Sequence, residues 1–184
     1  MSKTLSEVLK VRPVVSDDVG RFISLDHHTS TDHVWQMGFS QNREEVAVRF
    51  NQVRLPRLMR VHYPRDPQWL AEHWRERDLV LVAEYDQQLH GYLALNQGPG
   101  PAATWVTDLV VDLASRRRGV ATRLLAEARA WSFEHGFHKL VMEMQAKNFP
   151  AISLAQKLGF AFSGYSDQYY PDQEIALFFT LPVR

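Results

Sequence analysis

The sequence predicts an α/β fold in which one strongly twisted mixed sheet carries helices on both faces. After residue 104 the apolar pattern runs strand, helix, strand, helix, an order that requires parallel neighbouring strands. Residues 79–95 and 162–181 are instead typical of hairpins, whose strands pair antiparallel. The sheet is therefore expected to contain both kinds of pairing.

The first 77 residues are expected to form short strands and two capped helices. A polar turn at 40–45 separates two alternating apolar segments, although a helix over 43–52 competes with the second of them. Pro56 is expected to end that segment, because proline donates no backbone hydrogen bond. In chain order the expected elements are a strand at 11–15, a helix capped at Ser16, a loop at 27–30, strands at 34–37 and 46–55, and a helix at 66–77 with Pro67 in its first turn.

The rest of the chain gives clearer elements. A helix over 120–135 shows apolar and small residues at helical spacing, and Gly136 after it is suited to a left-handed cap. Residues 98–103 formally match a dinucleotide-binding pattern, but two prolines lack N–H donors and a strand follows, so we interpret them as a connector. The other expected elements are strands at 79–85, 89–95, 104–112 and 139–145, a helix at 149–158, and a final hairpin over 162–170 and 174–181.

The composition limits the classes of function. The chain has 184 residues, enough for one domain, and its 21 basic residues balance 21 acidic ones. Neither a nucleic-acid nor a membrane partner is expected, because both would favour a basic surplus. The sequence contains no cysteine, which excludes disulfides and cysteine-bound zinc. No metal site is expected at His27, His28 and His33, which lack a further ligand pattern.

The N-terminal residues lack the apolar core of a signal peptide. No stretch of the sequence approaches the ~18 consecutive apolar residues of a membrane-spanning helix. A cytoplasmic location is therefore expected.

The most informative stretch is 108–122, which is typical of a strand, a loop with three arginines and a glycine, and the start of a long helix. The first backbone N–H groups of a helix have no partner within it, and the helix dipole is positive at that end. Gly119 allows close approach of a ligand to the backbone, and the arginines add positive charge. The stretch therefore predicts a site for a phosphate or pyrophosphate.

This stretch resembles the GNAT superfamily of acyl-CoA-dependent N-acyltransferases. Residues 116–121, Arg-Arg-Arg-Gly-Val-Ala, fit the family loop Arg/Gln-x-x-Gly-x-Gly/Ala, and residues 109–111 fit the strand before it. Residues 148–160 resemble the family's Asn-x-x-Ala…Gly-Phe helix, and the C-terminal half is most similar to ribosomal-protein-alanine N-acetyltransferases. The resemblance covers about 78–181. It implies one GNAT domain over 1–184, with 78–181 as the acyl-CoA-binding core and 1–77 as a variable acceptor-side part. It also implies that two neighbouring parallel strands splay apart and that the acyl-CoA enters between them.

The resemblance implies that acetyl-CoA, or coenzyme A, is bound as a co-substrate. Backbone groups of Leu109 and Val111 would pair with the pantetheine arm, and amides from Arg117 to Thr122 would hold the pyrophosphate. Asn148 would contact the CoA arm or a catalytic water; a helix N-cap is the alternative, and the two are compatible. The expected binding residues are Leu109, Val110, Val111, Arg116, Arg117, Arg118, Gly119, Val120, Ala121, Thr122 and Asn148.

Amine acylation also needs a base, because an alkyl ammonium has a pKa near 10. Glu143 resembles the catalytic glutamate of the alanine N-acetyltransferases, five residues before the asparagine. Asp108, a carboxylate within an apolar strand, is the second candidate. Salt-bridged or solvated strand carboxylates are the structural alternative for both.

One position departs from the family. A tyrosine that protonates the CoA thiolate commonly stands four residues before the Gly-Phe pair, and here that residue is Ala155. Tyr165, Tyr169 and Tyr170 are candidate substitutes, and the thiolate can also leave unassisted because its pKa is near 8.5.

The sequence thus predicts transfer of an acetyl group from acetyl-CoA to a primary amine. Ala155 keeps open a non-catalytic acyl-CoA-binding or sensing module, and a nucleotide-phosphate-binding protein is a weaker alternative. The amine acceptor, which is a small molecule or a peptide, is not specified by the sequence, and homodimerisation stays open.

Overall fold

The computed structural model describes residues 9–100 and 102–183. The chain divides into two compact units that interleave along the sequence. Unit 1 contains the described residues up to His27, then Asp66–Glu143 and the residues from Thr180 onward. Unit 2 contains His28–Arg65 and Met144–Phe179.

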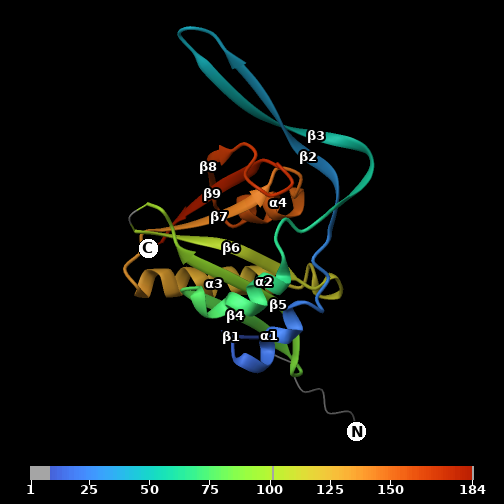
Figure 1. Cartoon of the computed structure of the whole chain (residues 1–184), viewed down its shortest axis with the longest axis vertical. Helices are drawn as coiled ribbons and strands as arrows, with labels where there is room; N and C mark the ends of the chain where they lie inside the picture. The colour runs from blue at the N-terminus through green and yellow to red at the C-terminus, as the bar shows by residue number, and fades with distance from the viewer. Residues whose placement is uncertain (1–8, 101, 184) are drawn as a thin grey trace. The chain divides into compact units, whose positions relative to one another are not determined.

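Unit 1 is built on a sheet with the strand order β1-β4-β5-β6-β7 (Figure 1). The pairs β1/β4, β4/β5 and β5/β6 are antiparallel, and β6/β7 is parallel, which confirms the mixed sheet predicted from the sequence. The strands are β1 (Lys10–Pro13), β4 (Leu79–Tyr85), β5 (Gln88–Gln97), β6 (Ala103–Val111) and β7 (Lys139–Gln145), of which β7 runs on into unit 2.

Helices cover both faces of this sheet, as predicted. Tyr92 and Gly91 are consecutive on β5, so they point to opposite faces. The Tyr92 ring stacks on Phe22 of α1 (Ser16–Phe22), with ring centroids 4.6 Å apart. A Cβ atom built on Gly91 would lie 3.3 Å from a methyl carbon of Val120, the first residue of α3 (Val120–Glu134). The absence of a side chain at Gly91 therefore lets the start of α3 approach β5 closely.

Helix α3 forms where the sequence places it. Its buried residues recur at helical spacing, and Arg123 and Glu127 form the expected ion pair one turn apart, at 3.4 Å. Gly119 is the N-cap, and Gly136 after the last turn has φ +77°, the predicted left-handed cap. The buried residues of α3 are Val120, Leu124, Leu125, Ala128 and Ser132.

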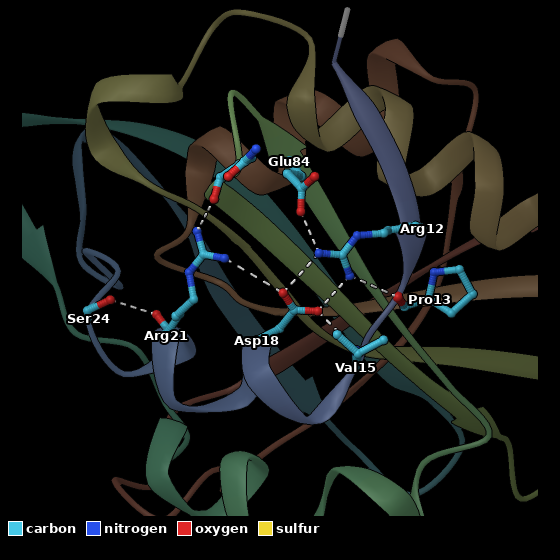
Figure 2. Close-up of polar contacts among 8 residues, drawn as sticks. Arg12, Pro13, Val15, Asp18, Arg21, Ser24 and Glu84 are labelled. Atoms are coloured by element: carbon cyan, nitrogen blue, oxygen red, sulfur yellow. Dashed lines mark hydrogen bonds and ion pairs between the residues drawn. The ribbon is translucent and has the colours of Figure 1, made fainter.

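Unit 1 also contains a charged cluster that joins β1, α1 and β4 (Figure 2). The Asp18 carboxylate is buried and accepts hydrogen bonds from Arg12 at 2.6 and 3.0 Å. Arg12 also donates to Glu84 on β4. The N-cap of α1 is Val15 rather than the expected Ser16, and the Asp18 carboxylate accepts the Val15 backbone N–H at 2.9 Å.

The second helix of unit 1, α2 (Pro67–His73), begins as the sequence predicts. Asp66 is its N-cap and accepts the backbone N–H of Gln68 at 2.9 Å, with Pro67 in the first turn. A 3₁₀ turn, Trp74–Glu76, follows directly. No helix within residues 9–100 and 102–183 is long and apolar enough to cross a membrane.

Unit 2 contains a long two-stranded ribbon of β2 (Thr29–Gln41) and β3 (Val46–Val61), which Figure 1 shows in blue and cyan. The competing helix over 43–52 is therefore wrong. The expected end at Pro56 is also wrong, because β3 continues to Val61. The pairing shifts from His33–Arg54 to Thr31–Met59, so Pro56 lies in a bulge. Residues in the bulge make no ladder hydrogen bond, so the missing N–H of proline costs nothing there.

The rest of unit 2 contains a short helix and two strands, the second of which runs on into unit 1. Helix α4 (Phe149–Lys157) is followed by β8 (Ala161–Ser166) and β9 (Ala176–Pro182), which are neighbours and form the predicted final hairpin. The ribbon is attached to this part, since the Trp35 N–H donates to the Ala146 carbonyl at 2.9 Å. The Phe50 ring packs against those of Phe162 and Tyr165 at 5.6 and 5.3 Å.

Candidate functional site

Strands β6 and β7 pair over only four residues, from Ala103 with Lys139 to Val106 with Met142. Beyond this last pair β6 continues for five residues to Val111, without a β7 partner. This is the separation of parallel strands expected at the site. It leaves one edge of β6 outside the ladder in the region where the sequence placed the CoA arm.

The backbone groups on that edge can be identified from the pairing with β5. Asp112 donates its N–H to the His90 carbonyl at 2.9 Å, so positions 112 and 110 face β5. Leu109 and Val111 alternate with them and therefore present their N–H and C=O groups on the side away from β5. The Val111 carbonyl accepts a hydrogen bond from Arg116 Nε at 2.9 Å. The Leu109 groups and the Val111 N–H are thus placed to pair with an extended ligand.

The loop after β6 ends at the start of α3, where the sequence predicts an anion site. Gly119 has φ +86° and ψ 1°, a left-handed conformation that favours glycine. A Cβ atom built there would meet no protein atom within 4 Å, so the space beside the backbone is open. As N-cap, Gly119 offers no side-chain acceptor to the amides of Val120, Ala121 and Thr122. An uncapped, accessible helix start of this kind fits a pyrophosphate.

The three loop arginines have different surroundings. Arg117 and Arg118 are exposed, and Arg117 has φ +64°. Arg116 is half-buried and donates to two backbone carbonyls: Nε to Val111 at 2.9 Å and Nη2 to Asp26 at 3.1 Å. The positive charge available to a phosphate therefore comes mainly from Arg117 and Arg118.

Three further side chains anchor the loop, and sequence reasoning missed them. The Asp112 carboxylate accepts the N–H groups of Ala114 and Asp26, each at 3.3 Å. Ser115 is buried, and its hydroxyl lies 2.6 Å from Nδ1 of His90 on β5. Asp112 could have been found as an N-cap, since it precedes the short 3₁₀ turn Leu113–Ser115. No local pattern points to the long-range partners.

Asp108 lies beside a β-bulge in β6. Ala94 pairs with Asp108 and Leu95 with Val106, so Thr107 is the extra residue. The Thr107 hydroxyl lies 2.9 Å from Asp108 Oδ2 and 3.3 Å from the Ala94 carbonyl oxygen. Asp108 is only 3% exposed, which makes it a buried carboxylate held by at least one donor.

Glu143, the other expected base, stands on β7 directly after Met142, where the ladder with β6 ends. It is half-buried, between fully buried neighbours on either side. Unit 1 thus places Glu143 and Asp108 on two adjacent strands, both just beyond the last β6–β7 pair.

Asn148, in unit 2, is the N-cap of α4, which confirms the second of the two roles predicted for it. Its side-chain oxygen accepts the Ala151 N–H at 3.2 Å. Ala155, four residues before Gly159, is completely buried in α4.

The candidate substitutes for the missing tyrosine lie in different settings within unit 2. Tyr165 packs on Phe50, and Tyr169 is exposed and packs edge-to-face on Tyr170 and Phe178. Tyr170 is buried, with the guanidinium of Arg65 5.4 Å from its ring centroid. Exposure therefore favours Tyr169 as the tyrosine that solvent or a ligand can reach.

Comparison with known proteins gives a consistent result. The model of the acetyltransferase (GNAT) family matches residues 48–160, more than half of the chain. The chain is 27% identical, over 76% of its length and 87% of the relative's, to an N-alpha-acetyltransferase of Saccharolobus solfataricus.

Solved structures share the fold. The crystal structure of a nourseothricin acetyltransferase has a TM-score of 0.80 and 23% identity, covering 96% of this chain and 99% of the other. A Bacillus anthracis protein solved in complex with acetyl coenzyme A has a TM-score of 0.76 and 20% identity, covering 95% and 99%.

Proposed function

Because this chain belongs to the acetyltransferase (GNAT) family, we propose that it transfers an acetyl group from acetyl-CoA to a primary amine by direct attack. One arrangement in unit 1 supports the proposal. The end of β6 has no pairing with β7, and a short loop leads from it to the start of α3, which no side chain caps. In acetyl-CoA an extended arm leads to a pyrophosphate, so the arm would lie along β6 and the pyrophosphate at the helix start.

The donor would be held mainly by the backbone. The pantetheine arm would pair with Leu109 and Val111 as if it were an added strand, and the pyrophosphate would bind the amides from Arg117 to Thr122. Backbone N–H groups on the same edge of β6 would stabilise negative charge as it develops on the thioester oxygen.

The chemistry requires one proton transfer and one leaving group. Acetyl-CoA supplies the thioester: the new bond joins the amine nitrogen to the acetyl carbon, and the carbon–sulfur bond breaks. Glu143, directly or through water, would accept the proton that the amine loses, with Asp108 as the second candidate. The sulfur would leave as a thiolate or take a proton from a tyrosine, and Tyr169 is the most exposed of the three candidates.

We assign the whole chain to one GNAT domain in which residues 78–181 bind acyl-CoA and residues 1–77 shape the acceptor side. The family model begins at residue 48, so part of the β2–β3 ribbon also falls within the shared region. The relatives are named for different acceptors, one an alpha-amine and one nourseothricin, so both peptide and small-molecule amines are candidates.

A panel of primary amines assayed for CoA release from acetyl-CoA tests the proposal. We expect turnover with at least one amine, and loss of most of kcat in Glu143→Gln, on the order of 100-fold or more for a general base. The exposed Glu134→Gln on α3 makes the same chemical change and serves as the control. An unchanged kcat in Glu143→Gln would show that another group accepts the proton.

The alternative is an acyl-CoA-binding module without catalysis, which Ala155 favours because the usual acid is missing and the position is buried. It predicts that the chain binds acetyl-CoA but releases no CoA with any amine. Steady turnover that depends on Glu143 excludes it.

A further inference from the structure

Arg116 does not face solvent like its two neighbours, and its hydrogen bonds lead to another part of unit 1. Its guanidinium joins the carbonyl at the end of β6, on Val111, to the carbonyl of Asp26. Residues 116 and 26 are 90 positions apart in sequence, so this is a tertiary contact rather than a feature of the loop itself.

The segment of residues 25–27 is fixed by three contacts. The Asp26 carbonyl accepts from Arg116 at 3.1 Å, and the Asp26 N–H donates to Asp112 Oδ1 at 3.3 Å. Next to it, His27 Nε2 lies 3.0 Å from the hydroxyl of Tyr92, which pairs with Val110 across the β5–β6 ladder. All three contacts lead to β6, to its neighbour β5 or to the loop that follows β6.

We propose that Arg116 is a positioning residue that clamps residues 25–27 to the end of β6, and so fixes the acyl-CoA loop before any donor binds. Its Nε and Nη2 donate to backbone carbonyls, so we assign it to positioning the loop rather than to binding phosphate. This rests on the proposed function, since it deepens the description of the same donor site. Arg117 and Arg118 supply the charge that the pyrophosphate meets.

A clamp of this kind also affects the part of the donor that carries no charge. The Val111 carbonyl and Arg116 must stay in place for the Val111 N–H to be presented along the edge of β6. Loss of the clamp therefore weakens contacts to the pantetheine arm, which carries no phosphate, as much as contacts to the pyrophosphate. Loss of one charged hydrogen bond should therefore change the measured affinity or exchange rate about tenfold or more.

Amide hydrogen exchange of the ligand-free protein tests the clamp without any donor. We expect residues 24–28 and 111–116 to exchange about tenfold faster in Arg116→Ala than in the wild type. Arg118→Ala removes the same charge from an exposed position and should leave residues 24–28 unchanged. Asp112→Ala removes the acceptor of the Asp26 N–H and should speed exchange in the same peptides. The Arg116/Asp112 double variant should increase exchange by less than the two single changes combined, because both residues belong to one network.

Donor truncation tests the link to catalysis. With acetyl-CoA and with acetyl-pantetheine, which lacks the phosphates, Arg116→Ala should lose kcat/KM by a similar factor. Arg118→Ala should lose activity only with acetyl-CoA. Arg116→Lys, which keeps one donor group, should recover part of the loss in exchange protection and in activity with both donors.

The two experiments separate the proposals. Unchanged exchange at residues 24–28 in Arg116→Ala, with a loss confined to acetyl-CoA, would overturn the clamp and restore Arg116 as a phosphate ligand. Faster exchange in a protein that binds no donor at all would instead uphold the clamp and contradict the proposed function.

Discussion

Val106 and Met142 form the last pair of the parallel ladder between β6 and β7, and β6 continues beyond them for five residues. The elements of the proposed donor site lie on the unpaired side of that pair. Leu109 and Val111 follow on β6, and Glu143 is the next residue on β7. The point at which the two strands stop pairing therefore defines where the co-substrate would enter the sheet.

Gly119→Ala tests the left-handed helix start. A Cβ atom has space there but φ is +86°, so the substitution should cost about 1–2 kcal/mol of stability and raise KM for acetyl-CoA. Gly20→Ala in α1 is the matched control, since it also has no atom within 4 Å but lies within a helix. The control should be neutral or stabilising by up to about 1 kcal/mol. Equal effects of both changes in urea unfolding would contradict the strain argument.

Gly91→Ala tests the close approach of α3 to the sheet. The added Cβ would lie 2.5 Å from the Val110 carbonyl oxygen and 3.3 Å from a Val120 methyl carbon, so backbone must move. Overpacking of this kind costs typically about 1–3 kcal/mol. Because the shift falls on β6 and on the first residue of α3, the affinity for coenzyme A should fall as well. A thermal melt and a coenzyme A titration that both match the wild type would refute this.

Asp18 should make stability depend on pH. The hydrogen bond from Arg12 is the main reason that the pKa of the Asp18 carboxyl lies below its ordinary value, and burial opposes this effect. A lowered folded-state pKa stabilises the protein above the unfolded-state pKa of about 3.9, and this contribution is lost as pH falls through the folded-state value. Asp18→Asn should cost about 1.5–3 kcal/mol at pH 7, because Arg12 loses its charged hydrogen bonds to Asp18 but keeps Glu84.

Urea unfolding between pH 7 and pH 2 measures this dependence. The difference in unfolding free energy between wild type and Asp18→Asn should shrink steadily as the pH falls below about 4. A difference that stays constant over that range would show that the charge of Asp18 is not what stabilises the fold.

Two variants of Asn148 separate its two expected roles. Asn148→Ala removes the cap from Ala151 and should cost about 1 kcal/mol. Asn148→Asp keeps a capping oxygen and should preserve stability, while removing the amide that the resemblance assigns to the CoA arm. A raised KM for acetyl-CoA in the aspartate variant, at unchanged thermal stability, would indicate both roles. Unchanged KM would leave Asn148 as a cap alone.

The sequence was sufficient to predict features that depend on local chemistry. Gly119 and Gly136 mark the two ends of α3, and Asn148 and Asp66 cap their helices where expected. These predictions succeed because a cap or a left-handed residue is set by a few neighbouring atoms. The same reasoning predicted correctly where the loop ends and α3 begins, and anion binding there stays a prediction.

Features that depend on distant contacts could not be predicted. The three loop arginines look equivalent in sequence, yet Arg116 meets a carbonyl 90 residues away. Pro56 was expected to end a strand, but it lies in a bulge of the β2–β3 ribbon, where no ladder hydrogen bond is needed. Helix α1 begins one residue earlier than expected, with Val15 as its N-cap, and its Asp18 pairs with Arg12 of β1. In each case a tertiary partner outweighs the local preference.

The most direct test of the donor site is isothermal titration of coenzyme A into the wild-type chain. The account predicts one molecule bound per chain with a dissociation constant below about 1 mM, together with a rise in thermal stability at saturating ligand. No heat of binding and no thermal shift at millimolar coenzyme A would contradict it.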